Sequence, residues 1–236
     1  SVSVESGAGV AAGMGDESYR AAGASVTSEL SALLADGTVV VSVNSPGDDL
    51  LSRVGSSHVV VGLFDPVWQP EVAAGFAPTG ADMISLDLVP RSTRAQAVDV
   101  LSSMATVVGF QAVVLAAERL PKMLPLLITA AGTVKPARVL VLGAGVAGLQ
   151  AVATARRLGA VVDGFDIREE ALEQIRSLGA RSVDPPSTSD GTIPAPEAIH
   201  EALAPVVAEA DVVIAAAQIP GRRSPLLVTA AMVAGM

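Results

Sequence analysis

The sequence predicts an α/β protein of two doubly wound, Rossmann-like domains with parallel sheets, joined by a long bridging helix. Short valine-rich runs alternate with segments of helical spacing along the 236 residues, which is the pattern of parallel strands covered by helices. From Ala95 to Leu120 the only Gly or Pro is Gly109, so this stretch predicts one long helix. We therefore expect domains over residues 1–100 and 137–236, with the bridging helix and linker over 101–136.

In the first domain, alternation predicts the strands and 3.6-residue spacing predicts the helices. Residues 1–5 already alternate as a strand, so the domain looks truncated at its start. The expected strands are 1–5, 39–43, 58–63 and 83–88, and the expected helices cover 16–20, 28–35 and 48–54.

The second domain continues the alternation and also looks truncated, because no strand follows its last expected helix. Its expected strands are 139–142, 161–166 and 211–216, and its expected helices are 147–158, 169–178, 197–209 and 229–233, with a loop over 183–196. Each strand is followed by a helix, as in a dinucleotide-binding fold.

The composition excludes several classes of function. A net charge of −9 argues against nucleic acid and against binding to anionic lipid. The chain has no cysteine, which excludes thiol catalysis, disulfides and cysteine-ligated metals. His58 and His200 have no partner at ligand spacing, so no metal site is expected.

The apolar character raises the question of a membrane segment, since the mean hydropathy is +0.53. The longest uncharged run, residues 100–117, has only the minimal length for a bilayer and contains Ser102, Ser103, Gly109 and Gln111. A buried helix accounts for it better. We expect no transmembrane helix, no signal peptide and a soluble, cytoplasmic chain.

The most informative motif is Gly143-Ala144-Gly145-Val146-Ala147-Gly148, which follows an apolar strand and opens a helix. In a dinucleotide-binding turn the first glycine allows the tight turn, the second lets a pyrophosphate approach, and the third brings helix and sheet together. The phosphates then lie at the helix N-terminus. Asp166, at the end of the next strand, is placed to bind the ribose hydroxyls of an adenosine.

A second constellation lies between the domains, over residues 91–99 (RSTRAQAVD). One interpretation is a loop held by an Arg91–Asp99 ion pair, with the amide of Gln96 presented between them. The other is an ordinary helix start after Pro90, with Ser92 or Thr93 as its cap. The residues alone leave both open.

Together these segments resemble one family. RSTRAQAVDVLSS (91–103), TAAGTVKP (129–136) and GAGVAG (143–148) are similar to the NAD(H)-binding alpha subunit, domain I, of the proton-translocating NAD(P) transhydrogenase. VESGAG, DESYRAAGA, FDIR and AQIPG fit as well. The resemblance covers essentially the whole chain, without the family's first strand and helix and its C-terminal part. The transhydrogenase family that the sequence resembles is part of the wider alanine dehydrogenase superfamily.

The resemblance implies that this domain binds NAD(H) and exchanges hydride with NADP(H) held on a partner domain or beta subunit. The enzyme type would be the proton-translocating, Re/Si-specific transhydrogenase rather than the Si-specific one, active only with its partner. A membrane proton-channel domain would complete the complex. The chain would be a cytoplasmic homodimer, peripheral to the inner membrane and not inserted in it.

The resemblance also assigns roles to matching positions. Arg91, Gln96 and Asp99 would be the catalytic residues that contact the nicotinamide and its carboxamide, and Ser102 would reach the same ring. The remaining cofactor-binding positions are Gly143, Gly145, Val146 and Gly148 at the pyrophosphate, Asp166 and Arg168 at the adenosine ribose with Ile167 between them, and Gln218 at the edge of the cleft.

The alternative is an alanine dehydrogenase-like enzyme, which shares the fold and the glycine motif. Such an enzyme needs a cation for the substrate carboxylate and an acid/base histidine in the first domain. Where that family has lysine and histidine, this chain has Ser42-Val43-Asn44-Ser45-Pro46 and Leu63-Phe64-Asp65-Pro66. Transfer between two nicotinamides needs no proton donor, which favours the transhydrogenase.

Overall fold

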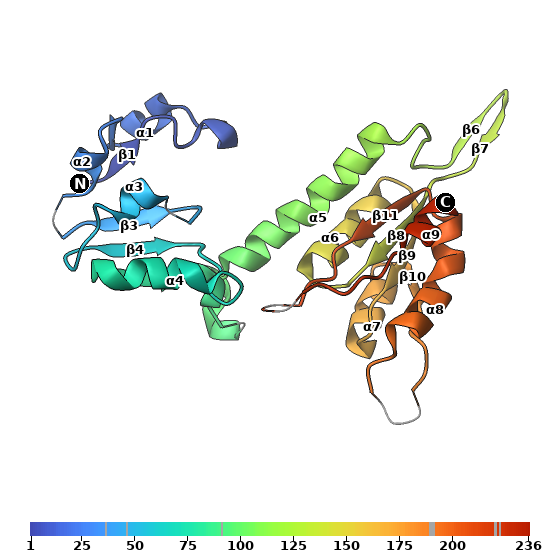
Figure 1. Cartoon of the computed structure of the whole chain (residues 1–236). Helices are drawn as coiled ribbons and strands as arrows, with labels where there is room; N and C mark the ends of the chain where they lie inside the picture. Colours follow the sequence, from blue (N-terminus) through green and yellow to red (C-terminus); the bar gives the residue numbers. More distant parts are fainter. Residues whose placement is uncertain (36, 46, 91, 189–191, 220, 222) are drawn as a thin grey trace. The chain divides into compact units, whose positions relative to one another are not determined.

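The chain folds into two compact units, Ser1–Val100 (unit 1) and Leu101–Met236 (unit 2), each of which is described by itself. The computed structural model describes residues 1–35, 37–45, 47–90, 92–188, 192–219, 221 and 223–236 (Figure 1). Both units are α/β with parallel sheets, so the predicted α/β class with parallel sheets is confirmed, whereas the bridging role of the long helix stays a prediction.

Unit 1 contains two parallel sheets. Strands β1 (Ser3–Glu5) and β2 (Ser25–Thr27) form the first, and β3 (Val39–Ser42), β4 (Val59–Gly62) and β5 (Asp82–Ser85) form the second in the order β3-β4-β5. The helices are α1 (Asp16–Ala21), α2 (Leu30–Leu33), α3 (Asp48–Leu51) and α4 (Pro70–Phe76), with short 3-10 helices η1 (Val10–Ala12), η2 (Ala77–Thr79), η3 (Leu86–Leu88) and η4 (Thr93–Val98).

The core of unit 1 lies on one face of the second sheet. Val54, Val60, Phe64 and Phe76 are buried there, and the two phenylalanine rings lie 5.6 Å apart between centroids. The valines of β3 and β4 favour strands because branched side chains pack well on a pleated surface. The sequence pattern therefore located these strands correctly.

The predicted strand 83–88 is wrong beyond Ser85. The chain turns there because the Asp87 carboxylate reaches back to accept from the Ser85 hydroxyl and, at 3.1 Å, from the Phe64 amide. Strand β2 and helix α4 were not predicted; α4 begins with Pro70 at its first helical position, a favourable place for proline.

The predicted long helix is shorter than expected. Helix α5 covers Val100–Arg119, whereas Thr93–Val98 forms the separate 3-10 helix η4. Asp99 separates the two with φ −78° and ψ 83°, which is not helical.

Helix α5 is, by length and composition, apolar enough to cross a bilayer; it is one such helix in the described part of the chain. The expectation that it is a buried helix is wrong for most of its length. Of its residues, Gly109 and Val113 are buried in unit 2, while Val107, Val108 and Phe110 are about half exposed.

Unit 2 is built on a four-stranded parallel sheet of order β10-β9-β8-β11. Its strands are β8 (Arg138–Leu142), β9 (Val161–Phe165), β10 (Arg181–Val183) and β11 (Val212–Ala215), and its helices after α5 are α6 (Val146–Arg157), α7 (Glu169–Ser177), α8 (Pro196–Glu209) and α9 (Ala230–Ala234). The antiparallel hairpin of β6 (Leu127–Thr129) and β7 (Gly132–Val134), and strand β10, were not predicted.

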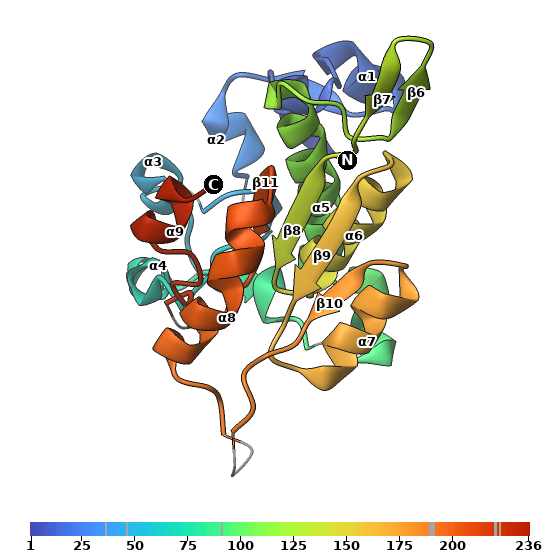
Figure 2. The same ribbon diagram turned by 90° about the vertical axis from the view of Figure 1, so that its right-hand side faces the viewer.

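Helices cover both faces of this sheet, which is therefore doubly wound. Helices α6 and α7 lie on one face, and α8 and α9 lie on the other (Figure 2). Along β8, Val139 and Val141 belong to the cluster formed with α6 and α7, and Leu140 and Leu142 belong to the cluster formed with α8 and α9. All four residues are buried, which explains why the strand is continuously apolar.

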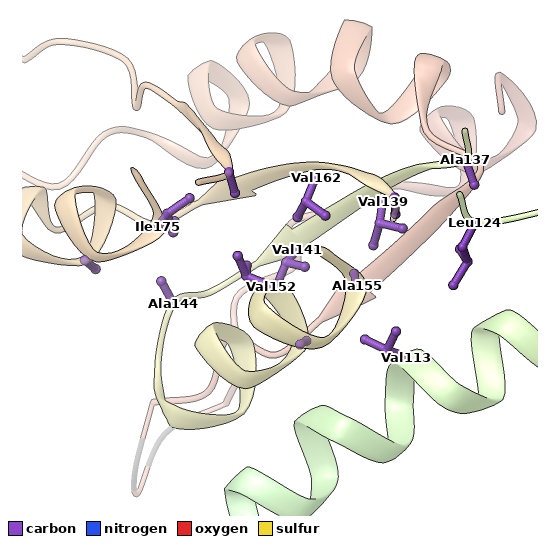
Figure 3. Close-up of a cluster of buried hydrophobic side chains, with 14 of the residues drawn as sticks. Val113, Leu124, Ala137, Val139, Val141, Ala144, Val152, Ala155, Val162 and Ile175 are labelled. Carbon is purple, nitrogen blue, oxygen red and sulfur yellow. The ribbon is translucent and has the colours of Figure 1, made fainter. Parts of the chain in front are cut away.

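Val113 joins α5 to the first of these clusters, projecting toward α6 (Figure 3). One turn earlier, Gly109 allows the two helices to touch through their backbones: a Cβ at Gly109 would lie 2.1 Å from the Ala147 carbonyl oxygen. Because that neighbour is backbone, the contact leaves no room for a side chain.

Replacing Gly109 by alanine should therefore destabilise unit 2 by about 2 kcal/mol, since overpacking forces backbone shifts. Gly75→Ala is the matched control, a helical glycine of α4 whose Cβ would meet only Leu51 Cδ1 at 3.6 Å. That change should stabilise unit 1 by roughly 0.5 kcal/mol through helix propensity. Urea denaturation of both variants measures the two effects, and equal effects would contradict the packing argument.

Candidate functional site

The glycine turn after β8 is shaped by contacts within the protein at its first and third glycines. Gly143 has φ +93°, donates its amide to the Phe165 carbonyl at 2.8 Å, and has the Ala217 backbone where a Cβ would lie. A Cβ at Gly148 would lie 1.8 Å from the Gly143 carbonyl oxygen. The fold itself therefore requires glycine at both positions.

Gly145 is different, because neither its backbone angles nor its packing against the described residues requires a glycine. Its angles (φ −78°, ψ −171°) suit any residue, and apart from its neighbours in the chain no atom of the described residues lies within 4 Å of the place its Cβ would occupy. It is the N-cap of α6 and is followed by the half-exposed Val146, so the open space lies at a helix N-terminus. A ligand phosphate that approaches the backbone here would account for the glycine.

Asp166 follows β9 at the same edge of the sheet and is 7% exposed. Its Oδ2 accepts from the Ala144 amide at 2.8 Å, inside the glycine turn. Its Oδ1 accepts from the Arg168 amide at 3.0 Å, and the Arg168 guanidinium binds both oxygens, with Nε at 2.9 Å and Nη2 at 3.0 Å. Ile167, between them, is largely exposed.

The carboxylate of Asp166 is held in its ionised form. Burial by itself raises its pKa, but the hydrogen bonds from Arg168 and from the Ala144 amide outweigh burial, so the pKa lies below its ordinary value. The pKa of Arg168 is raised in turn by its bond to Asp166. The site therefore holds one fixed negative charge and one cation on an exposed side chain.

A pocket opens at the point where the strand order reverses, between β8 and β11. It has a volume of about 340 Å³. Its lining includes Gly109 and Ala112 of α5, Ala147 of α6, and residues 214–218, of which Gln218 is the last. In doubly wound sheets, ligands bind at the carboxyl ends of the strands at such a switch point. The glycine turn, Asp166 and this pocket thus lie along one edge of unit 2.

The small residues of this pocket and the backbone amide of Ala144 were not predicted as parts of the site. Glycine and alanine have no functional group in their side chains, so their residue type does not indicate a binding role. The run Ala215-Ala216-Ala217 at the end of β11 was the available signal, because small residues there leave the pocket open.

The predicted nicotinamide side belongs mainly to unit 1. Gln96 is exposed in η4, whose N-cap is Ser92 without a side-chain cap bond, and Asp99 follows at its end. Arg91 lies outside the described residues. Ser102 lies on α5 in unit 2. The structure therefore places the glycine turn, Asp166, Arg168 and Gln218 in unit 2, while the roles of all the predicted site residues stay predictions.

Comparison with known proteins identifies the family. The family described as alanine dehydrogenase/PNT, C-terminal domain, matches residues 112–236, and its N-terminal domain matches residues 1–108. The chain belongs to the alanine dehydrogenase/PNT family. In the part of this family member that the structure describes, no three His, Asp or Glu side chains are grouped to hold a metal ion.

Within the family, the chain is similar to transhydrogenase alpha subunits. It is 40% identical to the NAD(P) transhydrogenase subunit alpha of Cereibacter sphaeroides over 99% of this chain and 47% of that protein. The transhydrogenase structure from Sinorhizobium meliloti superposes with a TM-score of 0.86 at 43% identity, covering 100% of this chain and 66% of that one. An L-alanine dehydrogenase structure gives 0.77 at 28% identity, covering 100% and 63%. The chain thus spans about half to two thirds of the length of these relatives.

If the open space at Gly145 receives a phosphate of NADH, Gly145→Ala should lower the affinity for NADH about tenfold or more, because the methyl group of the alanine would fill that space. The matched control is Gly15→Ala. Gly15 is also a helix N-cap, with φ −76° and ψ 165°, and apart from its chain neighbours no described residue has an atom within 4 Å of its Cβ position. Both variants should lose similar, small amounts of stability, under about 1 kcal/mol. Calorimetric titration with NADH should separate them, and equal affinities would contradict the assignment.

The lowered pKa of Asp166 predicts a pH dependence of stability. A carboxylate whose pKa is lower in the folded state stabilises the fold above its unfolded pKa, and this stabilisation is lost as the pH falls through the folded value. Asp166→Asn should therefore cost about 2 kcal/mol at pH 7, and the difference from wild type should shrink below about pH 4. Urea denaturation at pH 7 and pH 3 measures it, with the exposed Asp82→Asn as control. A constant difference would contradict the charge argument.

Proposed function

We propose that this chain is the NAD(H)-binding component of a proton-translocating transhydrogenase, which passes hydride between NAD(H) and NADP(H) held on a partner domain. The observation that carries the proposal is that the chain is more similar in sequence to a transhydrogenase than to an alanine dehydrogenase. Over the whole of this chain, it is 43% identical to a transhydrogenase structure and 28% identical to an L-alanine dehydrogenase structure.

The edge of unit 2 supports NAD(H) as the ligand. The open space at Gly145 fits a pyrophosphate at the N-terminus of α6, and the pocket of about 340 Å³ beyond β11 fits the nicotinamide half. Asp166, buried and ionised at the end of β9, fits the hydroxyls of the adenosine ribose and disfavours a 2′-phosphate.

The chemistry available in unit 1 supports transfer between two nicotinamides. Both lysines of the chain, Lys122 and Lys135, belong to unit 2. His58, the single histidine in the unit 1 sequence, precedes β4 and is buried, where Nδ1 accepts from the Gly55 amide at 3.0 Å. It is therefore at the amino end of the sheet, away from the carboxyl ends where substrates bind. Direct hydride transfer needs oriented rings and no such acid or base.

The remaining features of the proposal rest on the family resemblance of the sequence, and the names of the relatives support only the division into subunits. Their names describe alpha subunits, which implies that each is one component of a larger enzyme. The chain would accordingly act with an NADP(H)-binding beta subunit and a membrane proton channel. The enzyme would be the Re/Si-specific type, and the chain would form a homodimer on the cytoplasmic side of the inner membrane.

The second candidate is an alanine dehydrogenase-like activity, favoured by the match to the family shared by both enzymes. It predicts oxidation of NADH with pyruvate and ammonia by the chain alone. The transhydrogenase proposal predicts no such oxidation, and hydride exchange only after a partner domain carrying NADP(H) is added.

The experiment that tests the proposal uses Gln96, the exposed amide of η4 that we assign to the nicotinamide carboxamide. Gln96→Leu should lower hydride transfer between NADH and an NADP analogue at least tenfold in the reconstituted complex, about 1.4 kcal/mol of barrier, with NADH affinity changed little. Gln96→Asn should give an intermediate rate. Gln69→Leu, another exposed glutamine of unit 1, is the matched control.

Two outcomes would count against the proposal, and they differ in meaning. A wild-type rate in Gln96→Leu would contradict the assignment of Gln96 to the nicotinamide carboxamide, but it would not contradict the transhydrogenase function. No exchange by the wild-type chain with any NADP(H)-binding partner would remove the transhydrogenase function itself.

A further inference from the structure

The Asp166 carboxylate is fully hydrogen-bonded by donors of the protein itself. It receives four hydrogen bonds, from the amides of Ala144 and Arg168 and from Nε and Nη2 of the Arg168 side chain. A carboxylate offers about four acceptor positions. The hydroxyls of a ribose would find none of them free.

The four donors differ in how firmly they are held. The Ala144 amide belongs to the glycine turn, and the Arg168 amide belongs to the N-cap of α7, so both are fixed by the fold. The Arg168 guanidinium instead sits on a flexible side chain that is 60% exposed. It can leave Asp166 while the backbone around it stays in place.

The two positions that the guanidinium occupies match a ribose diol in chemistry. Nε and Nη2 lie side by side and each donates to a different oxygen of Asp166, at 2.9 Å and 3.0 Å. Neighbouring 2′- and 3′-hydroxyls are likewise two donors side by side. A guanidinium fork and a diol therefore compete for the same edge of one carboxylate.

We propose that Arg168 takes the place of the ribose hydroxyls at Asp166, and that its displacement from Asp166 tunes the selectivity for NAD(H) over NADP(H). The inference rests on the proposed function and names the residue that adjusts the preference of its nucleotide site. NADH offers two hydroxyls that replace the guanidinium. NADPH has a 2′-phosphate, which cannot donate to Asp166 and needs a cation beside it.

Arg168 acts in opposite directions on the two nucleotides. It opposes NADH because its bond to Asp166 must be broken first. It assists NADPH because the guanidinium offsets the negative charge of Asp166 and pairs with the phosphate. The arginine therefore reduces the discrimination that Asp166 alone would give.

The test is the affinity of the chain and its variants for NADH and for NADPH, measured by calorimetric titration. Arg168→Ala should bind NADH about threefold more tightly, because the ion pair with Asp166 no longer has to be broken, and NADPH about tenfold more weakly. The ratio of the two dissociation constants should rise about thirtyfold. Arg168→Lys keeps the charge without the fork, so its NADPH affinity should stay within about threefold of wild type.

The matched control is Arg176→Ala, which removes an exposed arginine of α7 that pairs with Glu169. It changes the net charge equally and should leave the ratio within about twofold of wild type. Thermal denaturation checks that each variant is folded; because the Arg168 amide remains in Arg168→Ala, the turn around Asp166 keeps both backbone bonds.

The outcomes separate this inference from the proposed function. Wild type that binds NADH, with an unchanged ratio in Arg168→Ala, would overturn the inference alone. A tenfold loss of NADH affinity in Arg168→Ala would also overturn it, since Arg168 would then be a direct contact of the bound nucleotide. Wild type that binds neither nucleotide would overturn both.

Discussion

The site in unit 2 depends on backbone-to-backbone packing around the N-terminus of α6. Gly148 lies against the carbonyl of Gly143, Gly143 lies against the backbone of Ala217, and Gly109 of α5 lies against the carbonyl of Ala147. These contacts join β8, α6, α5 and the segment after β11 without any intervening side chain. Close packing of this kind fixes positions tightly, because backbone cannot move aside as a flexible side chain can.

This packing also determines the chemistry of the edge. With glycine and alanine around the start of α6, the surface offered to a ligand is largely backbone, at the end of a helix whose first amides have no partner within the helix. The charged groups at the end of β9 are Asp166 and Arg168, and they neutralise one another as an ion pair. The phosphate region and the ribose region therefore depend on different segments of the sequence, the first on small residues and the second on one ion pair.

The features that sequence could predict are those set by local pattern. Buried strands such as Arg138–Leu142 are continuous apolar runs, and the glycine turn has a fixed spacing, so both were located correctly. The end of β5 could not be predicted, because Asp87 turns the chain by bonds to the distant Phe64 amide. The hairpin of β6 and β7 was missed because each strand has only three residues, too few for a periodic signal.

The same distinction applies to the site. The positions of Gly143, Gly148 and Asp166 follow from spacing, but the engagement of Asp166 by Arg168 is a matter of side-chain conformation, which spacing does not determine. When an aspartate and an arginine are two residues apart after a strand, their side chains can either form an ion pair or point away from each other. Sequence could therefore assign Asp166 and Arg168 to the ribose region, but it could not show that the two side chains engage one another.

On the proposed function, the division of polar groups between the units follows from the reaction. Hydride transfer between two nicotinamides requires that the rings be held in orientation, and it requires no proton donor at the reacting carbon. An amide such as Gln96 suffices to orient a carboxamide, whereas a lysine or histidine nearby would invite reaction with small oxo acids. The buried position of His58, bonded to the Gly55 amide, keeps the imidazole of unit 1 within the fold. On the proposed function, the absence of lysine from the sequence of unit 1 and the burial of its histidine thus suit nucleotide-to-nucleotide transfer, while the edge of unit 2 supplies the nucleotide site.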